Sequence, residues 1–288
     1  MDRHLIQMPE GNIHVVTDGD GGPPVLLLSG GGIDNALLSW KHMIPALAPT
    51  HRVIAPDWPK QGLSRPWSGV ADHQRLLRCI TEVLDHFSIE RASVVGLSQG
   101  GALALAYAIA EPKRVERVVA IAPGGTLSFP PGLHQLLWLS AKLPWLLTAT
   151  TRLFLRHRSQ CALFARKALF TGPVEDFDDV VDAIHDEVLA GGGGASDWQN
   201  NSIGFLGMKV DLRPDLHRID CPVLFVQGDK DIGVAPRHTI DAARRVAGSE
   251  LTMLKNNGHW PNRQSPGQVN ELVAAFLARP LQEARRRR

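Results

Sequence analysis

The sequence contains too few cysteines for a disulfide framework. Only Cys79, Cys161 and Cys221 occur in 288 residues, and their spacing fits no zinc motif. Cys221 precedes the apolar run 222–226, which favours a buried thiol. We therefore expect a fold without disulfides. The reaction that the motifs described below predict needs no metal or other cofactor.

Long apolar runs are also missing. No stretch approaches the roughly 18 residues that span a bilayer, and residues 1–4 lack the apolar core of a signal peptide. We therefore expect a cytoplasmic protein without integral membrane association. The net charge is only +2, and no aromatic residues alternate with basic ones, so we expect no nucleic-acid partner. The arginines at 285–288 are interpreted as a solvated end.

The composition is that of a globular protein, with 44% apolar and 21% charged residues. Short continuous apolar runs, typical of strands buried on both faces, occur at residues 25–28, 52–55, 92–96, 118–122, 223–226 and 250–254. Helical patterns lie between them. Asp72 is a candidate cap for a helix with one apolar stripe, a small-residue helix is expected at 102–110, and Ser265 with Pro266 starts a final helix.

Alternating strands and helices predict a mostly parallel sheet flanked by helices. The alternation stops near Gly124, and residues 126–211 have helical patterns and a glycine-rich joint but no convincing strand. We therefore predict one α/β core, formed by residues 1–125 and 212–288, that is interrupted by a helical cap at 126–211.

Ser98 lies in a Gly-x-Ser-x-Gly motif between an apolar strand and a helix. A nucleophile elbow requires this context, because its serine occupies a sharp, strained turn. Gly96 and Gly100 remove side chains that would collide with the neighbouring strand and helix. The N-terminus of the following helix favours the negative charge that develops on a reacting carbonyl oxygen. We therefore predict Ser98 as a nucleophile rather than an idle serine in a tight turn.

An oxyanion needs two backbone N–H donors. Gln99, directly after the nucleophile, is expected to supply one, and the glycine loop after the first apolar run is expected to supply the other. At this loop the sequence resembles the α/β-hydrolase family, whose members usually carry His-Gly there. Ser29 stands in the place of that histidine. The resemblance implies Gly31 as the second donor, with Gly30 or Gly32 as alternatives.

His259 follows the last predicted strand in the segment Asn-Gly-His-Trp-Pro, which is similar to the Gly-His-Trp ending of the same family. An imidazole supplies a base with a pKa near 7. A carboxylate must orient it, and matching residues 228–231 to the family's Gly-x-x-Asp signature selects Asp231 over Asp229. The order Ser98, Asp231, His259 is the order of this family's triad.

A fourth resemblance lies at residues 57–64, which match the family's Asp-x-x-Gly-x-Gly-x-Ser loop, with Lys60 in place of the first glycine. We expect a structural loop, with Trp58 near the pocket. The resemblance covers nearly the whole chain outside the insertion. It implies the α/β-hydrolase fold, a mostly parallel central sheet flanked by helices with a helical cap that shapes the pocket.

The predicted cap has an uneven charge pattern. Residues 133–170 contain six basic residues and no acid, whereas residues 171–187 contain seven acids and no Lys or Arg. We expect the two segments to pair or to face solvent; the alternative is a basic site for an anionic substrate. Leucines and tryptophans at 133–147 are expected to form cap core or pocket wall. A membrane-surface helix there is less favoured, because Pro144 interrupts it.

Substrate contacts are predicted at Gly32, Trp138 and Trp260.

These patterns favour an enzyme that hydrolyses a small, apolar ester, lactone or thioester through an acyl-enzyme. A serine at the elbow argues against haloalkane dehalogenases and epoxide hydrolases of this fold, which use aspartate there. Two alternatives stay open: a C–C bond hydrolase or cofactor-free lyase or cyclase on the same scaffold, and a non-catalytic small-molecule receptor. The sequence leaves the oligomeric state undetermined.

Overall fold

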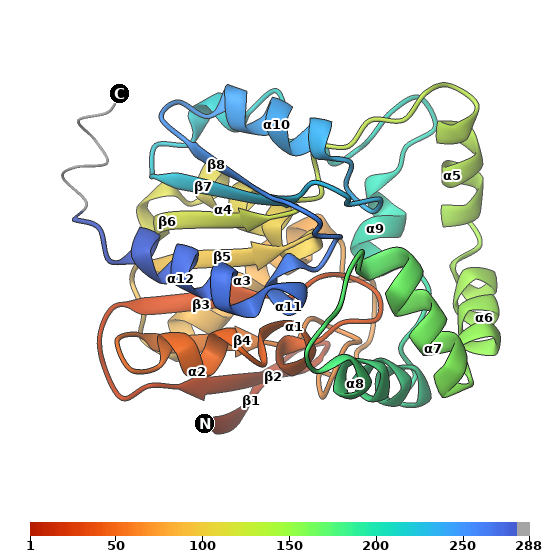
Figure 1. Ribbon diagram of the computed structural model, residues 1–288, viewed down its shortest axis with the longest axis horizontal. Helices are drawn as coiled ribbons and strands as arrows, with labels where there is room; N and C mark the ends of the chain where they lie inside the picture. The colour runs from red at the N-terminus through yellow and green to blue at the C-terminus, as the bar shows by residue number, and fades with distance from the viewer. Residues whose placement is uncertain (281–288) are drawn as a thin grey trace.

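The fold is built on a central sheet, seen in a computed structural model that describes residues 1–280 (Figure 1). The predicted tail at 285–288 lies outside the described residues. Within residues 1–280 the sheet has eight strands in the order β1-β2-β4-β3-β5-β6-β7-β8. The strands are β1 (Asp2–Met8), β2 (Gly11–Asp18), β3 (Pro24–Leu28), β4 (Arg52–Pro56), β5 (Ala92–Leu97), β6 (Val115–Ile121), β7 (Val223–Gly228) and β8 (Glu250–Leu254).

All six strands that were expected from apolar runs are present, and from β4 to β8 neighbouring strands pair in parallel. Most of their side chains are buried on both faces, as parallel strands under helices require; residues 25–28 of β3, for example, are fully buried. The expected burial on both faces is wrong for β8, an edge strand in which Leu251 and Met253 are each 36% exposed. The predicted fold class is therefore confirmed. The sequence patterns did not predict β1 and β2, which form an antiparallel hairpin and join the sheet through β4.

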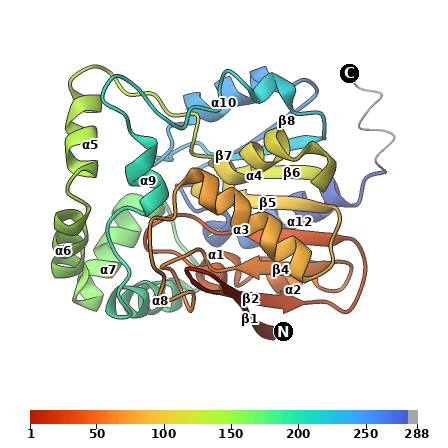
Figure 2. The same cartoon turned by 180° about the vertical axis from the view of Figure 1, so that it is seen from behind.

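Helices cover both faces of the sheet (Figures 1 and 2). One face carries α3 (His73–His86) and α4 (Gln99–Ala110), and the other carries α2 (Met43–Leu47) and α12 (Pro266–Leu277). The remaining short helices of the core are α1 (Ala36–Trp40), η1 (Pro112–Arg114), η3 (Leu216–Arg218), α10 (Pro236–Arg245) and α11 (Pro261–Gln264). Two apolar clusters fill the layers on either side of the strands.

The starts of three helices can be compared with the sequence signals that predicted them, and two of the three differ. The Asp72 carboxylate accepts a hydrogen bond from the N–H of Arg75 and caps α3 as expected. Helix α4 begins at Gln99, three residues before the predicted start. Ser265 precedes α12, but its hydroxyl donates to Asn257 Oδ1 at 2.9 Å and makes no capping bond to the helix.

The segment between β6 and β7 is helical, as predicted. It contains α5 (Leu133–Ala141), α6 (Pro144–Leu155), α7 (Arg158–Phe164), the π-helical turn η2 (Ala165–Leu169), α8 (Phe177–Leu189) and α9 (Asp197–Ser202). These helices lie together at one end of the sheet (Figure 1). We call this segment the cap; its exact limits at residues 126 and 211 stay a prediction.

Candidate active site

Ser98 occupies a strained turn between the end of β5 and the start of α4. Its backbone angles are φ 53° and ψ −110°, a region that non-glycine residues rarely adopt. A side chain at Gly100 would collide with the backbone of Leu28 in the neighbouring strand, and one at Gly96 would collide with Gly100 itself. The two glycines therefore permit the turn that presents the Ser98 side chain at the end of the sheet.

Ser98, His259 and Asp231 come together from three separate loops. The Ser98 hydroxyl lies 3.0 Å from His259 Nε2, and His259 Nδ1 lies 2.9 Å from Asp231 Oδ2. Each residue follows a parallel strand, so all three reach the same end of the sheet. Of the two competing acids, Asp231 carries the oxygen that contacts the imidazole. This geometry lets the carboxylate hold the proton on Nδ1 and leaves Nε2 free to accept the serine proton.

Asp231 is buried and held by further donors. Its Oδ1 accepts the N–H groups of Gly233 and Val234 at 2.7 and 2.9 Å, and its Oδ2 accepts the amide of Gln227 at 2.9 Å. Gln227 is itself fixed by the hydroxyl of Thr239. These bonds orient the carboxylate toward His259. Sequence reasoning missed Gln227, although it stands only four residues before Asp231.

The glycine loop lies beside the nucleophile. A Cβ added to Gly30 would lie 3.7 Å from Ser98 Cβ, and one added to Gly31 would collide with the Gln99 side-chain amide. The Gly30 N–H is already donated to Asp34 Oδ2 at 2.6 Å. This bond argues against Gly30 as the second oxyanion donor and leaves Gly31, the predicted donor, with Gly32 as the alternative. The roles of Gly31 and of the Gln99 N–H stay predictions.

Residues of the 57–64 loop hold the glycine loop in place. The Trp58 indole donates to the carbonyl of Ser29 at 2.9 Å, and the Gln61 amide donates to the carbonyl of Gly32 at 3.2 Å. The Asp57 carboxylate accepts a hydrogen bond from His14 Nδ1 at 2.8 Å. It also accepts the backbone N–H groups of Ala36 and Leu63. The loop is therefore structural, as expected.

Asp34 is a buried acid that the sequence patterns did not single out. It accepts the N–H groups of Gly30 and Asn35 and the hydroxyl of Ser39. Burial raises the pKa of Asp34 to about 7, although these three donors act to lower it. Its hydrogen bonds fix the start of the glycine loop, which contains the predicted oxyanion donor Gly31.

The start of α9 brings cap residues onto the site. The Ser196 hydroxyl donates to Gln99 Oε1, and a Cβ on Gly31 would lie 3.1 Å from Gln199 Oε1. The Trp198 ring lies against Gly124, and its N–H donates to His73 at 3.0 Å. A helix start rich in Ser, Asp and Gln predicts only a capping box, so no sequence signal indicates this contact.

The predicted substrate residues lie in different places. Gly32 adopts φ 77° and lies against the carbonyl of Gly194 in the cap. Trp260 is buried, its ring 6.3 Å from that of Phe170, which gives it a packing role. Trp138 is half-buried in α5, with its ring 5.0 Å from that of Phe205. Substrate contact by all three stays a prediction.

Pairing between the two segments explains the charge pattern of the cap in part. Arg158, in the basic segment, bonds Asp178 and Asp182 of α8, in the acidic segment. Arg152 donates instead to the carbonyls of Gly191 and Gly192. The expectation that the two segments pair is thus confirmed at Arg158. The expectation that the apolar stripe at 133–147 is buried is wrong at several positions, because packing leaves Leu136, Trp145 and Leu146 exposed.

Two ion-pair clusters fasten the cap to the core. Glu187 of α8, 4% exposed, bonds Arg65 and accepts the side-chain amide of Asn35. Asp176, just before α8, bonds the buried Arg263 at 2.5 Å and also contacts Lys41 at 3.2 Å. Burial alone would raise the pKa of Asp176, but the Arg263 guanidinium outweighs it and the pKa falls to about 2.

We expect Asp176→Asn to lower the free energy of unfolding by about 2 to 4 kcal/mol at pH 7, because it leaves Arg263 buried without its counter-charge. A carboxyl with a lowered folded-state pKa stabilises above its unfolded pKa. The difference in the free energy of unfolding between wild type and Asp176→Asn should therefore become smaller as the pH falls from about 4 toward 2. Urea unfolding measures this. Asp178→Asn, at an exposed pair, should cost under about 1 kcal/mol; an equal cost at both sites would contradict the assignment.

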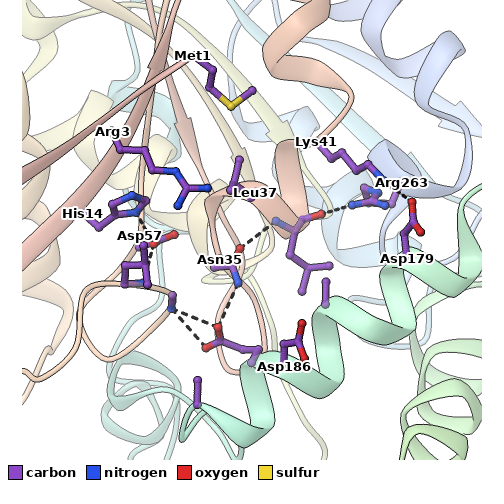
Figure 3. Close-up of a pocket in the computed structure, with 16 residues that line it drawn as sticks. Met1, Arg3, His14, Asn35, Leu37, Lys41, Asp57, Asp179, Asp186 and Arg263 are labelled. Atoms are coloured by element: carbon purple, nitrogen blue, oxygen red, sulfur yellow. Dashed lines mark hydrogen bonds and ion pairs between the residues drawn. The ribbon is translucent and has the colours of Figure 1, made fainter.

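A separate cavity of 530 Å³ lies between the N-terminal hairpin, α1 and α8 (Figure 3). Arg3, His14, Asn35 and Asp186 line it, whereas Ser98, Asp231 and His259 do not. Figure 3 shows Arg3 and His14 together on one side and Asp186 on the other. The cavity is therefore distinct from the triad.

Residues 1–280 lack two features that other classes of function require. No group of three or more His, Cys, Asp or Glu side chains in this range is placed to hold a metal ion. Nor does any helix in the same range combine the length and apolarity needed to cross a membrane.

The sequence model for the alpha/beta hydrolase fold matches residues 23–266, so the chain belongs to this family of hydrolases. It is 32% identical over 266 residues to the dihydrolipoyllysine-residue acetyltransferase component of an acetoin cleaving system from Pseudomonas putida. That match covers 90% of this chain and 64% of the relative, so the chain spans less than two thirds of that protein's length.

Two further proteins resemble the chain over its length. A 2-hydroxy-6-oxo-6-phenylhexa-2,4-dienoate hydrolase from Burkholderia cepacia is 28% identical over 286 residues, which is 92% of this chain and 91% of the relative. The enol-lactonase from Burkholderia xenovorans LB400 superposes with a TM-score of 0.77 at 20% identity, covering 96% of this chain and all of that one. At that identity the second likeness establishes the fold alone.

Proposed function

We propose that this protein is a serine hydrolase that cleaves a carboxylic ester or a related acyl compound, such as a lactone or thioester. Ser98 attacks the carbonyl carbon while His259 takes its proton. The N–H groups of Gln99 and Gly31 stabilise the oxyanion. His259 then returns the proton to the leaving group, and water releases the acyl group from Ser98 by the same route.

The observation that carries this proposal is the continuous hydrogen-bonded chain from Ser98 to Asp231. Distances of 3.0 and 2.9 Å are within the range for proton transfer and for orientation of the imidazole. The strained backbone of Ser98 supports the same assignment, because strain of this kind persists where a function requires it. A ligand-binding protein would need neither feature.

Hydrolysis of a C–C bond is the second candidate, and the names of the relatives favour it. Besides the Burkholderia cepacia protein, a 2-hydroxy-6-oxononadienedioate/2-hydroxy-6-oxononatrienedioate hydrolase of Klebsiella pneumoniae is 26% identical over 93% of this chain. Such acidic substrates call for a cation. Arg65 and Arg152, which reach the cap–core junction, are already engaged by Glu187 and by backbone carbonyls. We therefore place ester hydrolysis first.

A comparison of substrates separates the two reactions. We expect turnover of p-nitrophenyl esters of short fatty acids, and no turnover of 2-hydroxy-6-oxo-6-phenylhexa-2,4-dienoate above the rate of Ser98→Ala. Both reactions are followed by absorbance with the same enzyme preparation. Cleavage of the dienoate without ester turnover would replace the first candidate by the second, and turnover of neither would contradict both.

A further inference from the structure

Large apolar side chains are exposed on the two outermost helices of the cap. On α5 these are Leu133, Leu136 and Leu139, and on and before α6 they are Leu143, Trp145, Leu146, Leu153 and Phe154. Leu136 is 63% exposed and Trp145 is 67% exposed. We call this set the apolar face of the cap. Both views place α5 and α6 at the edge of the molecule farthest from the strands (Figures 1 and 2).

Helical spacing places Leu133, Leu136 and Leu139 on one side of α5, whereas the exposed apolar residues of α6 spread over about half of its circumference. Leu146 and Leu153 are seven residues, or two turns, apart and share one side of α6. The opposite side of α5 packs inward, because the buried ring of His134 donates to the carbonyl of Gly204 at 2.8 Å. The inner side of α5 is therefore packed at His134, and that of α6 is packed at the buried Leu155, while both helices present apolar side chains outward.

The loop 203–208 extends the apolar face. Phe205 is 54% exposed and Leu206 is 91% exposed. The carbonyl of Phe205 accepts the amide of Gln135 at 3.2 Å, and its ring contacts Trp138 of α5. These contacts hold the apolar tip of the loop beside the helix, so the loop and the two helices present one surface.

The charged residues of the two outer helices have a single sign. Residues 133–156 contain no Asp or Glu. Of their three basic residues, Lys142 and Arg156 are exposed, whereas Arg152 is exposed but already donates to the carbonyls of Gly191 and Gly192. Arg158, which pairs with α8, is not counted. A second copy of the chain, docking through the same patch about a twofold axis, would bring these positive charges together. An anionic lipid surface complements them instead.

We propose that the apolar face binds the surface of an anionic membrane, with α5 and α6 lying in the interfacial plane. Leu136, Leu146 and Trp145 enter the boundary between headgroups and acyl chains, while the basic side chains contact lipid phosphates. Pro144 stands at the first position of α6 and joins two short helices, so it does not prevent this arrangement. The binding does not depend on the chemistry at Ser98.

Cosedimentation with vesicles tests the proposal. Wild-type protein should bind vesicles of phosphatidylcholine mixed with phosphatidylglycerol at least about tenfold more tightly than phosphatidylcholine alone, and added salt should reduce the difference. Leu136→Glu should weaken binding to the mixed vesicles about tenfold or more, because it removes buried apolar area and adds a repelled charge. Leu5→Glu is the matched control, because Leu5 is equally exposed at 63% but lies on β1.

Thermal unfolding shows whether each variant is folded, and Leu206→Glu in the exposed loop repeats the test if Leu136→Glu is not. Equal vesicle binding by wild type, Leu136→Glu and Leu5→Glu would overturn the proposal, as would failure of wild type to bind the mixed vesicles. Sedimentation velocity adds one further outcome. Self-association that Leu136→Glu abolishes, without vesicle binding, would assign the face to a second copy and also overturn it.

Discussion

Ser98→Ala is expected to abolish both labelling by a fluorophosphonate and turnover, lowering kcat/KM about 10⁴-fold or more. A fluorophosphonate reacts only with a serine whose oxygen is activated by a base. Ser98 is placed to meet this condition, since its hydroxyl lies 3.0 Å from His259 Nε2 at the N-terminus of α4. Mass spectrometry of the labelled peptide locates the modified residue, and ester turnover is measured in parallel.

Ser159→Ala is the matched control, because Ser159 is an exposed serine of α7. This variant should keep full labelling and turnover. Thermal unfolding of Ser98→Ala should match that of wild type within a few degrees, because alanine fits the same turn. Labelling of another serine in the wild-type protein, or undiminished turnover by Ser98→Ala, would show that the nucleophile lies elsewhere.

The three triad candidates could be chosen from the sequence because each is fixed by its local chain. Ser98 needs small neighbours at Gly96 and Gly100, and each candidate follows a short apolar run that predicts a buried strand. Parallel strands bring their carboxyl ends to one edge of the sheet, so local order along the chain translates into proximity. The distances joining Ser98, His259 and Asp231 agree with that reasoning.

The supporting residues could not be predicted, because their contacts depend on the folded chain. Asp34 looks like a turn residue until its burial and its bond to Gly30 are known. Ser196 reaches Gln99 only through the placement of α9. The strand β1 gave no signal for a different reason: it lies at the sheet edge, where several of its side chains are exposed and no continuous apolar run is needed.

The cap shows a further limit of pattern reading. Apolar residues at helical spacing predict that one side of a helix is covered, but the pattern does not say by what. We expected cap core or pocket wall for the stripe at 133–147, whereas Leu136 and Trp145 are exposed. For the acidic segment the expected pairing is observed, because Asp178 and Asp182 both form ion pairs with Arg158.

Asp231→Asn is expected to lower kcat by about 10³- to 10⁴-fold. The reason lies in the donors around the carboxylate. Oδ1 accepts the N–H groups of Gly233 and Val234, so the oxygen of the new amide must stay there and its NH₂ group must face His259. The imidazole then accepts at Nδ1 and carries its proton on Nε2, where it cannot take the proton of Ser98.

The new NH₂ group would also face the amide N–H of Gln227, which donates to Asp231 Oδ2 in the wild type. Gln227 cannot simply turn over, because its oxygen accepts the hydroxyl of Thr239 and its nitrogen also donates to the carbonyl of Val234. We therefore expect a loss of stability of about 1 to 3 kcal/mol beside the loss of activity. Urea unfolding measures this loss, and kcat is compared under conditions where the variant is folded.

Asp229→Asn is the matched control for this experiment. Asp229 stands two residues away in the same loop, and its N–H donates to the carbonyl of Leu254, a bond that the substitution keeps. Its side chain does not supply the oxygen that contacts His259, so we expect kcat to change less than about tenfold. If Asp229→Asn proved the more damaging substitution, the orienting carboxylate would have to be reassigned, and the tautomer argument for Asp231 would fail with it.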